Sequence, residues 1–300
     1  MNILFDADRR LRNGWWMLVF IAFIAATRVV YAPLKAALAQ LGVTEAWLEP
    51  VPFLLTLLAT WAVLRLRRER LASVGFQMDR RWWRHAALGM ALGMGSLLLA
   101  AGLILAIGGV RFQPDPERSL AALGYGLYVF LFVSLLEENL FRGFLFQRLV
   151  AGAGAWVAQI AFALLFAFGH WDNPGMDGTT RLVASIELGL AAILLGLAYL
   201  RTRSLALPIG IHLGWNWAQG YVLGFGVSGM DHPGWLQPVF QGQATWLTGG
   251  EFGPEASVLG ILVDLLLIGL LWKWKGLAPA SDAVPVAPVA ATPTALPLNG

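Results

Sequence analysis

Long apolar runs that lack charged residues are the feature that most restricts the fold of this chain. Residues 120–136 carry no charge, and the run 143–169 contains only Arg148. A segment of about 20 apolar residues is long enough to cross a bilayer as a helix. Only 13% of the 300 residues are charged, whereas a soluble domain carries roughly 25%. The sequence therefore predicts an integral membrane protein.

The apolar segments can be counted because short polar or basic stretches separate them. We expect an all-α fold, a polytopic transmembrane helical bundle of about eight spans, with residues 15–276 as its domain. Residues 1–14 form a basic N-terminus, and residues 277–300, rich in alanine and proline, are expected to be a disordered tail. The predicted spans cover residues 15–34, 51–66, 86–107, 120–150, 153–169, 182–200, 205–225 and 258–272.

Basic residues cluster between the predicted spans, which is a loop bias of membrane proteins and not a nucleic-acid footprint. With eight spans all clusters fall on one side of the membrane, which the positive-inside rule places in the cytoplasm. We therefore expect both termini to be cytoplasmic. The alanine-, tryptophan- and arginine-rich composition indicates a bacterial inner (cell) membrane as the location. The clusters lie in the N-terminus, in residues 65–84, at Arg142 and Arg148, at Arg201 and Arg203, and at Lys273 and Lys275.

One apolar segment carries three charged residues close together: Glu137, Glu138 and Arg142. An ionised side chain at the bilayer centre costs roughly 2.5–3.5 kcal/mol, and the usual reason for such a residue is a functional site. Glu138 and Arg142 are four apart, so they share a helix face and can form an ion pair. Glu137 is rotated by about 100° from that face, and a carboxylate without a cationic partner can act as a general acid or base. The alternative is an ion pair that only fixes helix packing.

Two of the four histidines belong to apolar segments. His212 and Asn216 lie inside the seventh predicted span, four residues apart, and therefore share one helix face. They can form a polar contact between helices or donate hydrogen bonds to a developing oxyanion. His170 follows the fifth predicted span and, taken alone, is interpreted as a polar residue at the membrane interface. The remaining histidines, which lie in polar loops and are expected to be solvated or interfacial, are His85 and His232.

Several kinds of chemistry are excluded by what the sequence lacks. The chain has no cysteine, so thiol catalysis, thiolate metal sites and disulfides are excluded. No histidine opens a His-Glu-x-x-His pattern, and no Gly-x-Ser-x-Gly elbow is present. A set of two glutamates, two histidines and an asparagine remains on three apolar segments. Such a set can activate water and hold an oxyanion, but it can also ligate a metal or relay protons.

Three motifs on successive apolar segments resemble the pattern of the CPBP family of intramembrane endopeptidases (CAAX protease and bacteriocin-processing, also called Abi), which is related to the type II CAAX prenyl endopeptidases. The family pattern is Glu-Glu-x-x-x-Arg, then Phe-x-x-x-His, then His-x-x-x-Asn. Each motif alone is weak, whereas the ordered set is specific. The resemblance covers about residues 120–220, and residues 250–255 are also similar to bacterial members. The motifs are Glu137-Glu138-Asn-Leu-Phe-Arg142, Phe166-Ala-Phe-Gly-His170 and His212-Leu-Gly-Trp-Asn216.

The resemblance implies a catalytic role for matching residues. Glu137 would be the catalytic carboxylate, which activates water for attack on a peptide carbonyl. His170 would orient that water or share its proton, and His212 and Asn216 would stabilise the oxyanion. The catalytic set that the resemblance implies is completed by Glu138.

Two further residues would support this set, again by resemblance. Arg142 would keep Glu138 charged and position the helix with it, in agreement with the spacing of these two residues. Phe166 would pack beside His170. Counted along the predicted spans, His170 comes out nearer the outward end of the membrane than Glu137, so the fifth span must tilt, start later or end as a re-entrant segment.

The resemblance also bears on the cofactor, because these proteins are commonly classed as metalloendopeptidases. A carboxylate with two histidines is a known zinc set, so a bound divalent metal would have Glu137, His170 and His212 as its ligands. We assign no metal ligand and favour direct activation of water by Glu137, which requires no cofactor.

The function that these observations predict is that of an intramembrane endopeptidase. Its partners would be the lipid bilayer and a membrane-associated protein or peptide, with lipidated and CAAX-type proteins as candidates, and no nucleic acid. The alternative is a non-enzymatic membrane protein, an ion or proton carrier or an immunity-type scaffold, that uses the same cluster. Two further carboxyl groups within the spans, Glu187 and Asp264, could pair with Arg28 or with each other, or line a polar cavity. We leave both outside the catalytic set.

Overall fold

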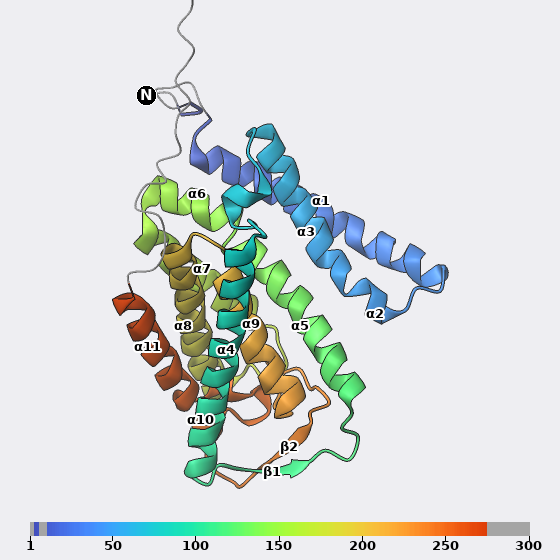
Figure 1. Ribbon diagram of the computed structural model, residues 1–300, viewed down its shortest axis with the longest axis vertical. Coiled ribbons are helices and arrows are strands. Elements are labelled where there is room, and N and C mark those ends of the chain that lie inside the picture. Colours follow the sequence, from blue (N-terminus) through green and yellow to red (C-terminus); the bar gives the residue numbers. More distant parts are fainter. Residues whose placement is uncertain (1–2, 6–10, 275–300) are drawn as a thin grey trace, which may run out of the picture.

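The structure, a computed structural model, describes residues 3–5 and 11–274 and is built almost entirely of helices (Figure 1). The predicted tail and half of the predicted basic N-terminus lie outside the described residues. The elements are α1 Asn13–Gln40, α2 Glu45–Leu48, α3 Pro50–Leu66, η1 Leu71–Val74, α4 Arg80–Ala106, β1 Val110–Pro114, α5 Leu120–Phe141, α6 Phe144–Ala153, α7 Ala155–Gly169, α8 Gly178–Thr202, α9 Ala206–Trp217, η2 Ala218–Val222, β2 Leu236–Phe240, α10 Thr245–Thr248, η3 Gly250–Phe252, η4 Pro254–Ala256 and α11 Val258–Lys273.

Every predicted span coincides with a helix or a pair of consecutive helices, which confirms the all-α polytopic fold class. Within the described residues, five helical segments are long and apolar enough to cross a membrane: α1, α2 with α3, α4, α5 with α6, and α8. Helices α7, α9 and α11 have 15, 12 and 16 residues, fewer than the roughly 20 that a full crossing needs. The chain is an integral membrane protein, and the number of eight spans stays a prediction.

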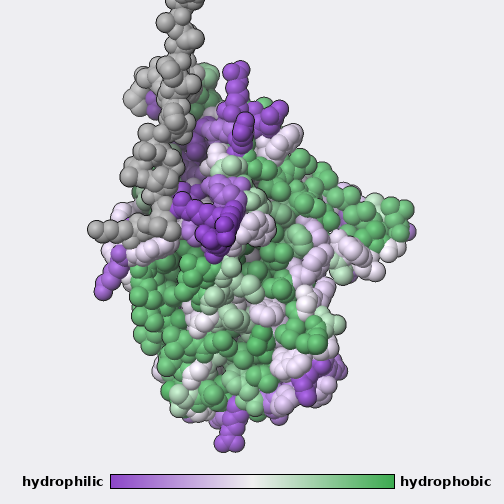
Figure 2. Space-filling model, in the orientation of Figure 1, coloured by the Kyte–Doolittle hydropathy of each residue, from purple (hydrophilic) through white to green (hydrophobic). Residues whose placement is uncertain are grey.

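The distribution of apolar side chains agrees with this membrane setting. In the view of Figure 2, hydrophobic residues cover the middle of the visible face, and the hydrophilic ones gather toward its two ends. Many large apolar side chains are exposed along the helices, for example Leu54 and Leu58 of α3, Leu164 and Leu165 of α7, and Leu266 of α11. A soluble monomer rarely exposes apolar patches of this extent, so lipid is the expected environment of these faces.

Helices α4 and α9 pack with their backbones in direct contact at four glycines. Gly89 and Gly93 of α4 face the carbonyl groups of Leu207 and Ile211 so closely that a Cβ atom on either glycine would overlap them. The converse holds on α9, where Gly210 and Gly214 face the carbonyl groups of Ala86 and Met90. Both pairs have the Gly-x-x-x-Gly spacing, which allows close approach of helices in a membrane. This contact fixes the position of α9, the helix that carries His212.

The predicted fourth span is not one continuous helix over residues 120–150. Helix α5 ends at Phe141, Arg142 is its C-cap, and α6 begins at Phe144 after Gly143. At this break the backbone of Gly143 comes so close to the carbonyl of Asn139 that a Cβ would overlap it. The glycine therefore allows the chain to change direction directly after the charged stretch.

Two segments that lie between the predicted spans pair with each other. Strands β1 and β2 form an antiparallel ribbon, with Val110 opposite Phe240 and Pro114 opposite Leu236. The ring of Phe112 packs edge-on against that of Phe225, with centroids 5.6 Å apart. The ribbon thus joins the segment that leads into α5 with the segment that follows α9 and η2.

The first helix is longer than its predicted span. Helix α1 continues through Pro33 to Gln40, and only Phe20 among its residues is buried. Helices α1 and α3 lie side by side and extend to the right of the other helices in Figure 1. Because of the extra length, Arg28 lies near the middle of α1 and not near its far end.

We expect a Cβ atom at position 93 to destabilise the fold. The substitution Gly93→Ala places a methyl group against the backbone of α9, and overpacking of this kind typically costs about 1–3 kcal/mol. The matched control is Gly102→Ala on the same helix, where nothing lies within 4 Å of the added atom. Thermal unfolding in detergent should give a lower Tm for the first variant only; equal Tm values would contradict the close contact.

Candidate active site

The imidazole of His212 lies between the two adjacent glutamates of α5. Its Nδ1 is 2.9 Å from Oε1 of Glu138, and its Nε2 is 3.8 Å from Oε2 of Glu137. Because Glu138 is ion-paired and its carboxylate can only accept, Nδ1–H of His212 is the donor in the shorter contact. The side chain of Glu137 is 26% exposed, whereas that of Glu138 is fully buried. One carboxylate therefore faces open space, and the other holds the histidine ring in place.

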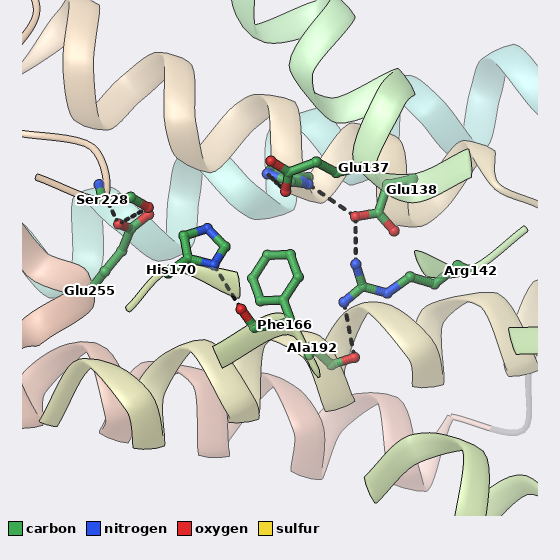
Figure 3. A network of polar contacts seen from close by, with 9 residues as sticks. Glu137, Glu138, Arg142, Phe166, His170, Ala192, Ser228 and Glu255 are labelled. Atoms are coloured by element: carbon green, nitrogen blue, oxygen red, sulfur yellow. Dashed lines mark hydrogen bonds and ion pairs between the residues drawn. The ribbon is translucent and has the colours of Figure 1, made fainter. Parts of the chain in front are cut away.

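Glu138 and Arg142 form the ion pair that their spacing predicted. Nη1 of Arg142 donates to Oε1 of Glu138 at 2.9 Å, and its Nη2 donates to the carbonyl of Ala192 on α8 at 3.2 Å. The guanidinium also lies over the rings of Phe141 and Phe166, 5.8 and 5.2 Å from their centroids. Figure 3 shows this chain of contacts running from Glu138 through Arg142 to Ala192. It ties α5, α7 and α8 together through one buried cation.

His170 reaches the same region from the end of α7. Its Nδ1–H donates to the carbonyl of Phe166 at 2.7 Å, because a carbonyl can only accept, and this leaves Nε2 free for other contacts. The ring of Phe166 packs 4.7 Å from that of His170 and 6.5 Å from that of His212, centroid to centroid. The predicted packing of Phe166 beside His170 is thus present, and Figure 3 shows the phenyl ring between His170 and Arg142.

A cavity of about 530 Å³ brings most of the predicted residues together. Glu137, His170, His212 and Asn216 all line it, whereas Glu138 and Arg142 lie behind its wall. The rest of the lining is mainly apolar and comes from α5, α7, α8, α9 and the loop after η2. A volume of this size lies within the usual range for ligand sites. The expected difference in depth between His170 and Glu137 therefore does not separate them.

The sequence analysis missed Glu255, which lines the same cavity from the short turn η4. Its Oε2 accepts hydrogen bonds from the backbone N–H and the hydroxyl of Ser228, at 2.7 and 2.9 Å (Figure 3). Burial raises the pKa of the Glu255 carboxyl, while the hydrogen bonds from Ser228 lower it. The only sequence signal for this residue was the similarity of residues 250–255 to bacterial members of the family.

Neither of the two histidines expected to be solvated or interfacial is fully exposed to solvent. His85 is a buried residue of the first part of α4. His232 lines the cavity, with its ring 5.1 Å from that of Phe130 and 5.2 Å from that of Tyr221. Burial lowers the pKa of the His232 imidazole, which favours its neutral form. Polar neighbours in the sequence were a poor guide here, because His85 belongs to helix α4 and the loop that carries His232 folds back onto the bundle.

Glu187 and Asp264 are buried and line the cavity, which was one of the predicted alternatives for them. Oε2 of Glu187 and Oδ2 of Asp264 have no hydrogen-bond partner in the described part of the chain. Neither forms an ion pair with Arg28 among these residues. The wall of the cavity that α8 and α11 form thus carries two buried carboxyl groups.

The arrangement does not fit a metal centre. Among residues 3–5 and 11–274, no three histidine, aspartate or glutamate side chains are grouped as the ligands of a metal ion. His170 and His212 each use Nδ1 in a hydrogen bond, with the carbonyl of Phe166 and with Glu138, and such a contact is compatible with metal binding through Nε2. It is the absence of a group of three ligands in this part of the chain that leads us to derive no chemical step through a metal.

The comparisons with known proteins point to one family. The family described as "Rce1-like: Type II CAAX prenyl endopeptidase Rce1-like" matches residues 119–218, the segment from α5 to η2 that contains the three motifs. No curated protein and no solved structure matches the chain.

We expect Arg142→Ala to be strongly destabilising. It leaves the charge of Glu138 buried without a cation, and breaking a buried ion pair in this way typically costs about 3–5 kcal/mol. The double variant Glu138→Gln with Arg142→Ala should be less destabilised, since no charge remains buried. Thermal unfolding in detergent measures both, and a double variant at least as unstable as the single one would contradict the assignment.

Proposed function

We propose, from the match of residues 119–218 to the type II CAAX prenyl endopeptidase family, that this chain is an intramembrane endopeptidase of the CPBP, or CAAX protease, family and that Glu137, His170, His212 and Asn216 form its active site. The family implies peptidase activity in the membrane. The observation that carries the assignment of residues is their convergence on one cavity, with Nε2 of His212 3.8 Å from Oε2 of Glu137.

In the first step Glu137 acts as a general base. Water in the cavity gives one proton to the Glu137 carboxylate as its oxygen attacks the carbonyl carbon of the scissile peptide bond. The other O–H of the water donates a hydrogen bond to Nε2 of His170 and keeps its proton, while Nδ1–H of His170 is held by the carbonyl of Phe166. The histidine therefore orients the water, since the hydrogen bond on its other nitrogen fixes both its tautomer and its ring.

The tetrahedral intermediate carries a negative oxygen that needs hydrogen-bond donors. The amide N–H of Asn216 and, in its protonated state, Nε2–H of His212 are the donors on the cavity wall. Glu138 and Arg142 do not touch the substrate; they position His212 through the 2.9 Å contact of Glu138 to Nδ1. As the C–N bond breaks, Glu137 returns its proton to the leaving amine.

The apolar lining indicates the class of substrate. Val129, Val133 and Leu136 of α5 and Leu194 and Leu195 of α8 line the cavity together with the polar residues. A membrane-associated protein or peptide with apolar residues beside the scissile bond suits this lining, and lipidated or CAAX-type chains belong to that class. We also propose that the protein lies in the bacterial inner membrane with both termini in the cytoplasm.

The first test is Glu137→Gln, which should lower the rate of cleavage by about 10²–10⁴-fold, the usual contribution of a general base. Membrane proteomics of cells with the wild-type protein or this variant identifies substrates that accumulate uncleaved, and cleavage of one of them is then followed in detergent without an ion gradient. The control is Glu251→Gln, an exposed acid outside the cavity. Cleavage that survives in Glu137→Gln would contradict the role of Glu137 as the base, whereas the absence of cleavage by the wild-type protein without an ion gradient would favour the alternative, an ion or proton carrier.

The second test concerns the oxyanion. Asn216→Ala should lower kcat by about 10²–10³-fold with little change in KM, because the lost donor acts mainly in the transition state. The control is Gln241→Ala, an exposed residue of the loop after β2. A change confined to KM would instead assign Asn216 to substrate binding.

A further inference from the structure

Arg28 is a cation near the centre of a membrane-spanning helix. It is 15 residues after the first residue of α1 and 12 before the last, which corresponds to about 22 and 18 Å along a helix that rises 1.5 Å per residue. The arginine therefore lies far from both ends of the helix. A charge at this depth is costly, and such residues face a water-filled cavity or a partner.

No partner for Arg28 is found in the described part of the chain. Its guanidinium makes no hydrogen bond, ion pair or ring contact there. The other cation of α1 is different, because Lys35 pairs with Glu45 at 3.0 Å. Arg142, the deep arginine of α5, is paired as well. Arg28 alone among these three is left with its donors available.

Arg28 lines the same cavity as Glu137. It enters from α1, whereas Glu187, Asp264 and Glu255 contribute carboxyl groups from α8, α11 and η4. In Figure 1, α1 lies to the right of the bundle and α11 to its left. The cavity thus has a cation on one side and a wall rich in carboxyl groups on the other. An anionic group inside it would be attracted to the α1 side.

We propose that Arg28 binds a carboxylate of the peptide that occupies the cavity and so sets the direction in which the peptide lies across Glu137. This deepens the proposed function and rests on it, since the occupant is the substrate. The planar fork of a guanidinium matches a carboxylate with two parallel hydrogen bonds. A phospholipid phosphate is the weaker candidate, because phosphates lie at the membrane surface and Arg28 lies near mid-helix. The carboxylate is either the C-terminus of the peptide or an acidic side chain.

The test measures binding and not cleavage. The full chain with Glu137→Gln is reconstituted in nanodiscs of phosphatidylcholine and titrated with two pairs of dansylated apolar tetrapeptides. The first pair ends in a free carboxylate or a carboxamide, and the second, amidated pair carries glutamate or glutamine at one position. We expect the acidic member of one pair to bind about tenfold more tightly, as a charge-assisted hydrogen bond gives, and the pair concerned identifies the source of the carboxylate.

Substitutions at two cations of α1 then assign the preference. In the Glu137→Gln background, Arg28→Gln should reduce the preference to less than about twofold, and Arg28→Lys should retain part of it as a point charge. Lys35→Gln, which removes the other cation of α1 at its surface ion pair, should leave the preference unchanged. Equal Tm values of the variants show that the comparison is between folded proteins.

Three results would overturn the proposal. The first is equal or undetectable binding of the acidic and neutral peptides, and the second is a preference for the acidic peptide that persists in Arg28→Gln. The third is a preference that disappears when phosphatidylglycerol replaces phosphatidylcholine, because this would identify a lipid phosphate as the ligand. Failure of the proposed function gives a different result. In that case the wild-type protein leaves the peptides intact, while the Glu137→Gln protein still binds the acidic member of a pair more tightly.

Discussion

One carboxylate oxygen, Oε1 of Glu138, accepts hydrogen bonds from two side chains of the site. Arg142 on its own helix and His212 on α9 both donate to it at 2.9 Å. Arg142 in turn reaches α8 through the carbonyl of Ala192. In a fully buried setting, such charge-assisted contacts are strong and leave little freedom of orientation. The position of His212 beside Glu137 depends on this network, because Nε2 can point at Glu137 only while Nδ1 is held.

Backbone contact between helices complements this network. The glycines of α4 and α9 let the two helices meet without side chains between them, which suits a membrane, where apolar packing between helices gains little over packing against lipid. Helix α9 is thus fixed on one face by α4 and on another by Glu138. A short helix of 12 residues gains a defined position from these two contacts that its length alone would not provide.

Local periodicity predicted the parts of this molecule that depend on near neighbours in the sequence. The helical segments and the pair of Glu138 with Arg142 follow from hydrophobic runs and from the i, i+4 rule. The family pattern supplied the grouping of His170 with His212, since no spacing rule connects them. What could not be predicted depends on contacts between distant segments: the β1–β2 ribbon, and Glu255, which reaches the cavity from a three-residue turn without any periodic signal. The position of Arg28 near the middle of its helix could not be predicted either, because α1 continues through Pro33 beyond the predicted span.

The β1–β2 ribbon links α5 and α9, two of the helices that position the reactive groups. Strand β1 leads through a short loop into the start of α5, and β2 follows α9 and η2. The ribbon therefore connects the start of α5 with the segment that follows the end of α9. Because the ribbon connects the two helices, a tilt of α5 would also move α9, and a tilt of α9 would move α5. Opening of the bundle to admit a bulky chain is therefore easier on the side of α1, whose residues other than Phe20 are exposed or half-buried, than between α5 and α9, which the ribbon connects.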